Sequence, residues 1–342
     1  MNIKSPLSII ILAAGKGTRM KSEKAKVLHE VFFAPMVHHV LRAAVPLNPQ
    51  STVVVVGHQQ ERVKNALQDF QLTYAVQKEQ LGTGHAVLIT EDAIPQDHTT
   101  VLILCGDTPL IKSTTLVDMY NKHMASGASL TLMTTLLEDP TNYGRILSGD
   151  NGEVISIVEQ KDANTEQQKI QEINAGIYCA DREFLFRALK KVGTENSQGE
   201  VYLTDIVALA VADGLKVERY TTSYPLDVLG VNSRVELVQA HLELQKRRNQ
   251  EIMLGGVTLY SPHTALISQE SSVGRDSTLA AGVEITDNTM VGKSCTIGQG
   301  VILKNCRIGD SVTIGPYCCL TDVTIPAETT LPTYTNKVSI SE

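Results

Sequence analysis

In SIIILAAGKGTRM, residues 8–20, an apolar run ends in a loop rich in glycine and positive charge. The run predicts a buried strand over residues 8–15, and MVHHVLRAAV, residues 36–45, predicts a helix after it. The loop contains neither the GxxxxGK[ST] pattern of a Walker A loop nor GxGxxG. Its small residues, with Lys16, Arg19 and Lys26, still predict a local phosphate site, although a solvated basic turn is the alternative.

Strand-like and helix-like segments alternate through the first 230 residues. Strands are predicted at 51–58, 72–77, 99–107, 144–149, 153–160 and 172–180, and helices at 61–70, 82–94, 182–192 and 201–214. The runs VVVV and VLIL suit strands buried on both faces, so we expect an α/β fold with a Rossmann-like, mostly parallel sheet. Sites in such folds lie at the carboxyl ends of strands, where LAAGKGTR, VGHQQ and CGDTPL occur.

The pattern changes after a long predicted helix at residues 233–256, which begins with a Ser233–Glu236 capping box and ends at two glycines. Aliphatic residues then recur at intervals of six, with occasional contractions to five, at Ile267, Val273, Leu279, Ile285, Val291, Ile297, Leu303, Ile308, Ile314, Leu320, Ile325 and Leu331. This period is typical of hexapeptide repeats and predicts a short left-handed parallel β-helix of roughly four coils. The expected domains are therefore 1–232, a linker helix 233–256, and 257–342.

Composition and charge indicate a globular protein and argue against nucleic-acid binding, a membrane span and a zinc site. The 342 residues are 42% apolar and 20% charged, which is ordinary for a globular chain of two domains. A formal charge of −7 argues against general binding to nucleic acid, and no run reaches the roughly 20 apolar residues that span a bilayer. Six cysteines without a CxxC pair argue against zinc and for reduced thiols, so we expect a cytoplasmic protein.

A series of motifs gives the chain a family resemblance. LAAGKGTRM…KVLHEV is similar to the sugar-nucleotide pyrophosphorylases, which transfer a nucleoside monophosphate onto a sugar 1-phosphate. VQKEQLGTGHA, CGDTPLI, YGRI, IVEQKDA, EINAGIY, QGEVYLTDI and GVNSR follow in the order seen in the bacterial N-acetylglucosamine-1-phosphate uridylyltransferases. The resemblance covers residues 8 to about 255, and in that family a hexapeptide-repeat domain also follows. It makes 1–232 a nucleotidyltransferase (pyrophosphorylase) domain and 257–342 a shortened β-helix.

The resemblance implies a set of site residues. Those expected to bind substrate are Leu12, Ala13, Ala14, Gly15, Lys26, Gln77, Gly82, Thr83, Cys105, Gly106, Asp107, Gly144, Glu159, Asn174 and Asn232. Gln77 matches the uracil-reading segment, and an amide offers the donor and acceptor that uracil needs. Gly144, Glu159 and Asn174 match sugar-binding positions. Cys105 and Ala175 depart from relatives that carry Tyr and Thr there.

The catalytic residues implied are Arg19, Lys26 and Asp107, with Asp107 and Asn232 as ligands of Mg²⁺. Asp107 could instead be a turn residue, and Asn232 could only precede the helix cap. The second pKa of a phosphate monoester lies near about 6, so the attacking oxygen is already ionised and no general base is required. Cations then bring two anions together and stabilise the leaving pyrophosphate.

The expected reaction forms UDP-N-acetylglucosamine and pyrophosphate from UTP and N-acetylglucosamine 1-phosphate, for cell-wall (peptidoglycan) and lipopolysaccharide precursors. Alternatives are another sugar 1-phosphate, dTTP, or a non-catalytic sugar-nucleotide-binding subunit. Relatives acetylate glucosamine 1-phosphate in a longer β-helix, and no histidine follows His263 here to act as a base, so we expect no acetyltransferase activity. The repeats could also assemble the chain into a homotrimer.

Overall fold

The computed structural model describes residues 6–338, which form two compact units. Of the described residues, the first unit comprises 6–30 and 34–236, and the second comprises 31–33 and 237–338. Among residues 6–338, no helix is both long and apolar enough to cross a lipid bilayer.

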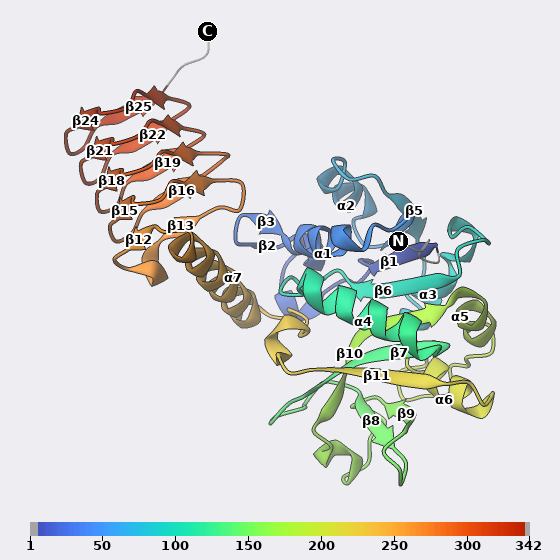
Figure 1. The fold of residues 1–342 in the computed structure, drawn as a ribbon. Helices are drawn as coiled ribbons and strands as arrows, with labels where there is room; N and C mark the ends of the chain where they lie inside the picture. The colour runs from blue at the N-terminus through green and yellow to red at the C-terminus, as the bar shows by residue number, and fades with distance from the viewer. Residues whose placement is uncertain (1–5, 339–342) are drawn as a thin grey trace. The chain divides into compact units, whose positions relative to one another are not determined.

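The first unit is built on one twisted sheet (Figure 1). Its main path is β11-β7-β10-β6-β1-β4-β5, with β1 (Leu7–Leu12), β4 (Ser51–Val56), β5 (Thr73–Val76), β6 (Thr100–Cys105), β7 (Leu130–Leu136), β10 (Glu172–Asp181) and β11 (Val217–Thr222). Every neighbouring pair on this path is parallel except those of β10, which runs antiparallel to β6 and β7. The predicted mostly parallel α/β fold is confirmed.

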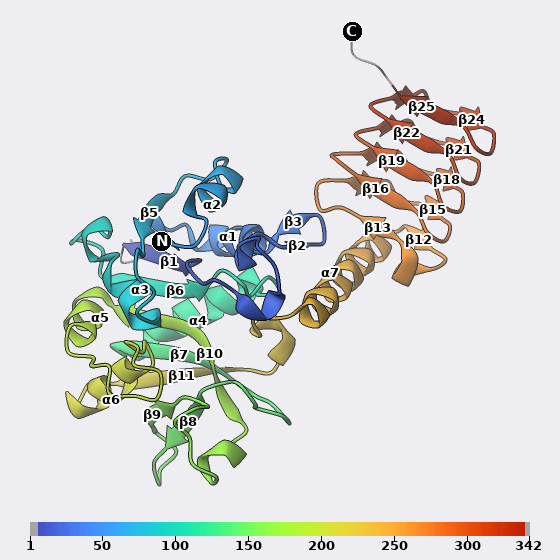
Figure 2. The same cartoon turned by 180° about the vertical axis from the view of Figure 1, so that it is seen from behind.

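Helices cover both faces of the sheet, because successive side chains of a strand point to opposite sides. Ile9 and Ile11 of β1 pack with α1 (Met36–Ala44), α2 (Gln60–Ala66) and α4 (Ser113–Ser126). Ile10 packs on the other face with α3 (Thr83–Leu88), α5 (Arg182–Leu189) and α6 (Asp205–Ala212). Figure 1 shows α1 and α4 on the near face, and Figure 2 shows α3 from behind. The three-residue run III is thus buried from both sides.

The register of β1 aligns the ends of three strands. Leu12, its last residue, lies opposite Val55 of β4 and Cys105 of β6. The loops that leave these strands therefore emerge at one edge of the sheet. A hairpin of β8 (Arg145–Ser148) and β9 (Val154–Val158) joins the sheet near the same edge, where Arg145 pairs with Ile173 of β10.

Several predicted helices are shorter than expected, and those over 61–70 and 182–192 end at Ala66 and Leu189. The helix expected over 82–94 ends at Leu88, where the hydroxyl of Thr90 donates to the carbonyl of Val87, and a 3-10 turn follows at Glu91–Ala93. The helix expected from residue 201 starts at Asp205. Residue Val201 cannot be helical because its N–H donates to Leu81 and its carbonyl accepts from Gly84, both at 2.8 Å. A long-range pairing thus overrides the local pattern.

The second unit contains α7 (Arg234–Leu254, of which residues from 237 belong here) and stacked coils of short parallel strands. The strands are β12 (Thr258–Leu259), β13 (Leu266–Ile267), β14 (Ser272–Val273), β15 (Thr278–Leu279), β16 (Glu284–Thr286), β17 (Met290–Val291), β18 (Thr296–Ile297), β19 (Ile302–Lys304), β20 (Arg307–Ile308), β21 (Thr313–Ile314), β22 (Cys319–Thr321), β23 (Thr324–Ile325), β24 (Thr330–Leu331) and β25 (Asn336–Val338). They form three sheets, as a β-helix requires. A separate two-stranded sheet of β2 (Glu30–Val31) and β3 (Ala34–Pro35) belongs neither to the large sheet nor to the β-helix.

The repeated aliphatic residues line the inside of the coils, as the six-residue period predicts. Eleven of the twelve belong to the buried core of this unit, and the twelfth, Val273, is partly buried and packs against it. Three thiols fill the same interior, because Cys295, Cys306 and Cys318 are each buried and hydrogen-bond to backbone carbonyls. All six cysteines, each within the described residues, are free.

Polar side chains of α7 cap the first coil of the β-helix. Gln245 and Asn249, both buried, donate to the carbonyl of Ala265 at 2.9 Å. The guanidinium of Arg248 donates to the carbonyls of Ser268 at 3.2 Å and Ser271 at 2.5 Å. An open coil end would leave such carbonyls without partners, and a buried unpaired polar group is costly. The helix therefore supplies the missing hydrogen bonds at that end.

Replacing Arg248→Met should lower the free energy of unfolding by about 2 kcal/mol, because two buried carbonyls lose a charged donor. Urea denaturation followed by circular dichroism measures this change. Lys246→Met is the matched control, since Lys246 is exposed on the same helix, and it should stay within about 0.5 kcal/mol of the parent. Equal stability of the two variants would contradict the capping role.

Candidate active site

The loop after β1 brings its main chain and two cations to the carboxyl edge of the sheet. Gly17 adopts φ +62°, and a Cβ there would lie 2.5 Å from the Cβ of Lys26, so only glycine lets the loop fold against that lysine. Lys26 begins a short 3-10 turn whose next two residues, Val27 and Leu28, are buried. The backbone of Lys26 is thus held in place, while its four-carbon side chain reaches into the cleft.

A cleft of about 380 Å³ opens at this edge. Its walls include the residues expected to bind the nucleotide, namely Leu12, Ala13, Ala14, Gly15, Arg19, Lys26, Gln77, Gly82, Thr83, Cys105, Asp107 and Asn232. One expected residue, Gly106, does not line it. A Cβ at Gly106 would lie 3.0 Å from the carbonyl of Leu12, whose oxygen accepts from the Gly106 N–H, so this glycine serves the packing of β6 against β1.

Two glutamines also line the cleft. Gln77 is 5% exposed, and its amide donates to the carbonyl of Gly82 at 3.0 Å and lies 3.1 Å from Nδ1 of His85. Gln80, which sequence reasoning did not single out although it lies in the quoted QKEQLGTGHA segment, donates to the carbonyl of Ala14 at 2.7 Å. These bonds fix the orientation of the Gln80 amide against the loop after β1 and that of the Gln77 amide against the start of α3.

Four predicted charged and amide side chains meet at one point of the cleft. The ammonium of Lys26 forms an ion pair with Asp107 and donates to Oδ1 of Asn232 at 2.5 Å. Arg19 donates to the same Oδ1 at 2.8 Å. The sequence separation between Lys26 and Asn232 is 206 residues, so only the fold brings them together. The predicted metal ligands Asp107 and Asn232 are thereby adjacent, each facing a cation.

The start of α7 positions Asn232. The predicted capping box is present, since the Glu236 N–H donates to the Ser233 hydroxyl at 3.2 Å and the Ser233 N–H donates to the Glu236 carboxylate at 3.0 Å. The Asn232 N–H also donates to that carboxylate, and its side-chain amide donates to the carbonyl of Gly230 at 3.0 Å. Asn232 does precede the cap, and the cap is what aims its side-chain oxygen at Lys26.

A second cavity of about 220 Å³ adjoins the first. It contains the three residues expected to bind sugar, Gly144, Glu159 and Asn174, and it shares Leu12, Thr83, Cys105, Asp107 and Asn232 with the larger cleft. Gly144 has no room for a side chain, because a Cβ there would lie 2.9 Å from Cγ2 of Ile157 and 3.5 Å from Oε2 of Glu159. The two cavities therefore meet at the residues that hold the cations.

Two ionisable groups of the second cavity, Glu159 and Cys105, are desolvated. Burial raises the pKa of Glu159, and the nearby acidic groups Asp162, Asp205 and Glu200 add to the shift, while the Thr204 hydroxyl, which donates at 3.2 Å, opposes it. Burial also raises the pKa of Cys105 to about 12, so its thiol stays protonated at neutral pH and hydrogen-bonds to the carbonyl of Gly176. Cys105 is therefore no nucleophile here.

Two arginines that sequence reasoning missed hold the β8–β9 hairpin, which carries Gly144 and Glu159 at its ends. Arg145 is 1% exposed and donates to the backbone carbonyl of Tyr143 and to the side chain of Gln160 at 2.7 Å. In the sequence, only its place inside the motif YGRI marks Arg145 as a candidate.

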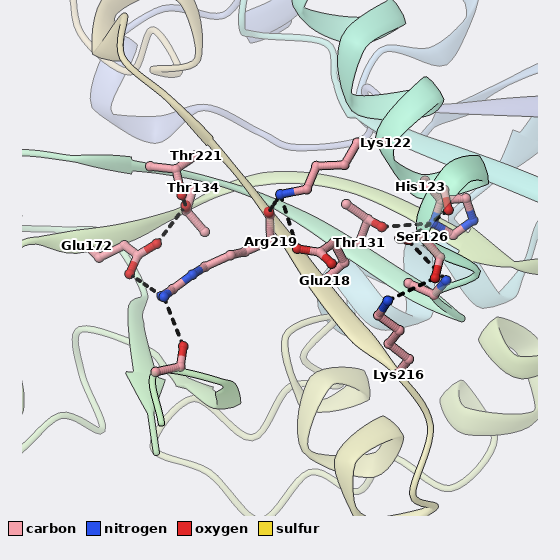
Figure 3. A network of polar contacts seen from close by, with 12 residues as sticks. Lys122, His123, Ser126, Thr131, Thr134, Glu172, Lys216, Glu218, Arg219 and Thr221 are labelled. Atoms are coloured by element: carbon pink, nitrogen blue, oxygen red, sulfur yellow. Dashed lines mark hydrogen bonds and ion pairs between the residues drawn. The ribbon is translucent and has the colours of Figure 1, made fainter. Parts of the chain in front are cut away.

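The second arginine lies on β11 and holds the far end of the hairpin. Arg219 forms an ion pair with Glu172 at 2.8 Å, as Figure 3 shows, and donates to the carbonyl of Gly152 at 2.9 Å. Thr134 donates to the same carboxylate at 2.8 Å. No local sequence pattern marks Arg219, because its partners come from β10 and from the β8–β9 turn.

Replacing Glu159→Gln should stabilise the protein at neutral pH. Because the folded-state pKa of Glu159 is raised, ionisation favours the unfolded chain, so the parent loses stability as pH rises through that pKa. The difference between variant and parent should vanish well below the ordinary glutamate pKa of about 4.3. Urea denaturation across pH measures it, and a variant less stable than the parent at pH 7 would contradict the assigned direction.

Comparison with known proteins shows to which family the chain belongs. Residues 8–240 match the Nucleotidyl transferase family. The protein named Bifunctional protein GlmU of Desulfotalea psychrophila is 52% identical over 332 residues, which cover 97% of this chain and 98% of that relative. Proteins of the same name from Geobacter metallireducens and Heliobacterium modesticaldum are 47% and 42% identical, and the matches cover 63% and 73% of those relatives. The expected resemblance is confirmed, and the chain belongs to the nucleotidyl transferase family.

Proposed function

We propose that the chain transfers UMP from UTP to N-acetylglucosamine 1-phosphate and releases pyrophosphate. The observation that carries this is the junction of the two cavities at Asp107 and Asn232. A nucleotide in the larger cavity and a sugar phosphate in the smaller one would present their phosphates to each other there. The family membership supports the same reaction.

The larger cavity suits a nucleoside triphosphate. Gln77 and Gln80 line it with their amides oriented, and an amide edge can pair with a uracil edge. Arg19 and Lys26 lie toward Asp107, where the phosphates would be neutralised. Gln77 alone does not separate uracil from thymine, so the base is decided by the test below.

The residues fit a divalent metal ion, and we assign it as Mg²⁺. Asp107 and Asn232 offer a carboxylate and an amide oxygen, the hard ligands that Mg²⁺ takes, and both already accept from cations. No group of three or more His, Cys, Asp or Glu side chains forms a metal cluster in the part of the chain that the structure describes. The remaining ligands would then be water and substrate phosphate. When bound, such an ion neutralises developing negative charge on the phosphates.

The chemical step needs no proton transfer. An oxygen of the sugar 1-phosphate attacks the α-phosphorus of UTP, a new P–O bond forms, and the bond from the α-phosphorus to the oxygen bridging to the β-phosphate breaks. That electron pair leaves with pyrophosphate, so charge builds on the leaving group. Lys26 and Arg19 stabilise it electrostatically and hold the reactants in line.

Acceptor binding falls to Gly144, Glu159 and Asn174 in the smaller cavity. Asn174 is oriented by its bonds to the Tyr178 hydroxyl at 2.6 Å and the Gly176 N–H at 3.0 Å. A carboxylate and an amide can pair with sugar hydroxyls and an acetamido group. Three expectations stay predictions from the sequence: the chain lacks acetyltransferase activity, it could form a homotrimer, and it is cytoplasmic.

The test of the proposal is pyrophosphate release from UTP, dTTP and other nucleotides with N-acetylglucosamine 1-phosphate, glucose 1-phosphate and glucosamine 1-phosphate, with Mg²⁺ or EDTA. UTP with N-acetylglucosamine 1-phosphate should give the highest kcat/KM, and EDTA should stop turnover. A higher kcat/KM for another pair would show that this pair, and not the proposed one, is the preferred substrate pair. Absence of turnover with every pair would refute the proposal that the chain is an enzyme of this kind.

Asp107→Asn should lower kcat by roughly a hundredfold or more, because an anchoring anion for the cations of the site is lost. The substitution is isosteric, so the circular dichroism spectrum should be unchanged. Asp69→Asn, at an exposed loop position, is the matched control and should keep full activity. Near-normal kcat in Asp107→Asn would remove this residue from the mechanism.

Gly144→Ala should raise KM for the sugar phosphate and leave KM for UTP unchanged. The added methyl group would lie between Ile157 and Glu159 on the wall of the smaller cavity. Initial rates with each substrate varied in turn separate the two constants. An equal rise in both would show that the smaller cavity is not a separate acceptor site.

A further inference from the structure

The proposed metal position is held by a protein cation in the described structure. The Lys26 ammonium contacts both predicted ligands, through its ion pair with Asp107 and its hydrogen bond to Asn232. An ion bound by the same two oxygens would need the space between them. The lysine and a divalent ion therefore compete for one position.

Oδ1 of Asn232 cannot accept from both of its donors and also bind a metal ion. A side-chain amide oxygen has two lone pairs, and Oδ1 of Asn232 already accepts from Lys26 and from Arg19 at 2.8 Å. A metal ion can take this oxygen as a ligand only after one of these donors leaves. Among the contacts of the two cations, Lys26 alone also pairs with Asp107, so its departure frees both ligands.

We infer that Lys26 occupies the divalent-ion position in the substrate-free enzyme, and that entry of the metal with its nucleotide moves the ammonium onto the nucleotide phosphate. This inference rests on the proposed function. A lysine suits such an exchange, because its compact charge sits on a flexible stem. The backbone of Lys26 need not move, since the buried Val27 and Leu28 and the packing against Gly17 hold it.

The charge of the cluster explains why metal and nucleotide would arrive together. Lys26 and Arg19 each place a positive charge against Oδ1 of Asn232, and repulsion from these charges disfavours a free divalent cation at that oxygen. The triphosphate supplies the negative charge that offsets this repulsion and gives the ammonium a new partner. Lys26 thus couples metal binding to nucleotide binding.

The experiment measures binding of Mn²⁺, used as the probe ion, to the substrate-free full chain by electron paramagnetic resonance of free Mn²⁺. Lys26→Met should bind Mn²⁺ about tenfold or more tightly than the parent, because one contacting positive charge is removed. Lys24→Met removes the same charge from the same loop, where Lys24 instead pairs with Glu30 at 3.6 Å, and should change the affinity less than about twofold.

The double variant Lys26→Met with Asp107→Asn should lose the gain, which assigns the added affinity to this site. Lys26→Gln serves in place of Lys26→Met if the latter is unfolded by circular dichroism. A Lys26 variant that binds Mn²⁺ no more tightly than the parent, or no more tightly than Lys24→Met, overturns the inference. The Mn²⁺ measurement needs no turnover, so this failure differs from failure of the proposed function, which appears as absence of pyrophosphate release by the parent chain.

Discussion

Pairing of β1 with β4 on one side and β6 on the other is the constraint on which the site depends. Because Leu12 lies opposite both Val55 and Cys105, the loops after these strands start at the same level of the sheet. A shift of one residue would move every side chain of β1 to the opposite face of the sheet. Burial of the isoleucine run on both faces thus determines where the loop after β1 and Asp107 can be.

The cation cluster follows from that alignment with one addition, the segment before α7. The N–H of Val231 donates to the carbonyl of Asp107 at 2.9 Å, and the capping box holds the next residues. Helix capping is common and is worth about 1 kcal/mol for stability. Here it also directs the Asn232 oxygen toward Lys26, so a local folding device contributes to the chemistry of the site.

The smaller cavity is organised differently, by a hairpin held through long-range contacts. Arg145 supports the hairpin from within, and Arg219 with Glu172 holds the turn at its far end. A buried arginine is costly to desolvate unless its guanidinium is hydrogen-bonded, and Arg145 donates to Tyr143 and Gln160. Gly144 and Glu159 depend on the hairpin, since they flank its two strands.

The α/β order, the capping box at Ser233 and the inward column of the β-helix could be predicted from the sequence, because they depend on local period and short-range hydrogen bonds. The family motifs also contain many residues of the two cavities. The late start of α6, the packing role of Gly106 and the support from Arg145 and Arg219 became visible only in the folded chain. The competition of Lys26 for the proposed metal position belongs to the same class. These features join residues far apart in the chain, and no periodicity records which distant carbonyl or carboxylate a side chain will meet.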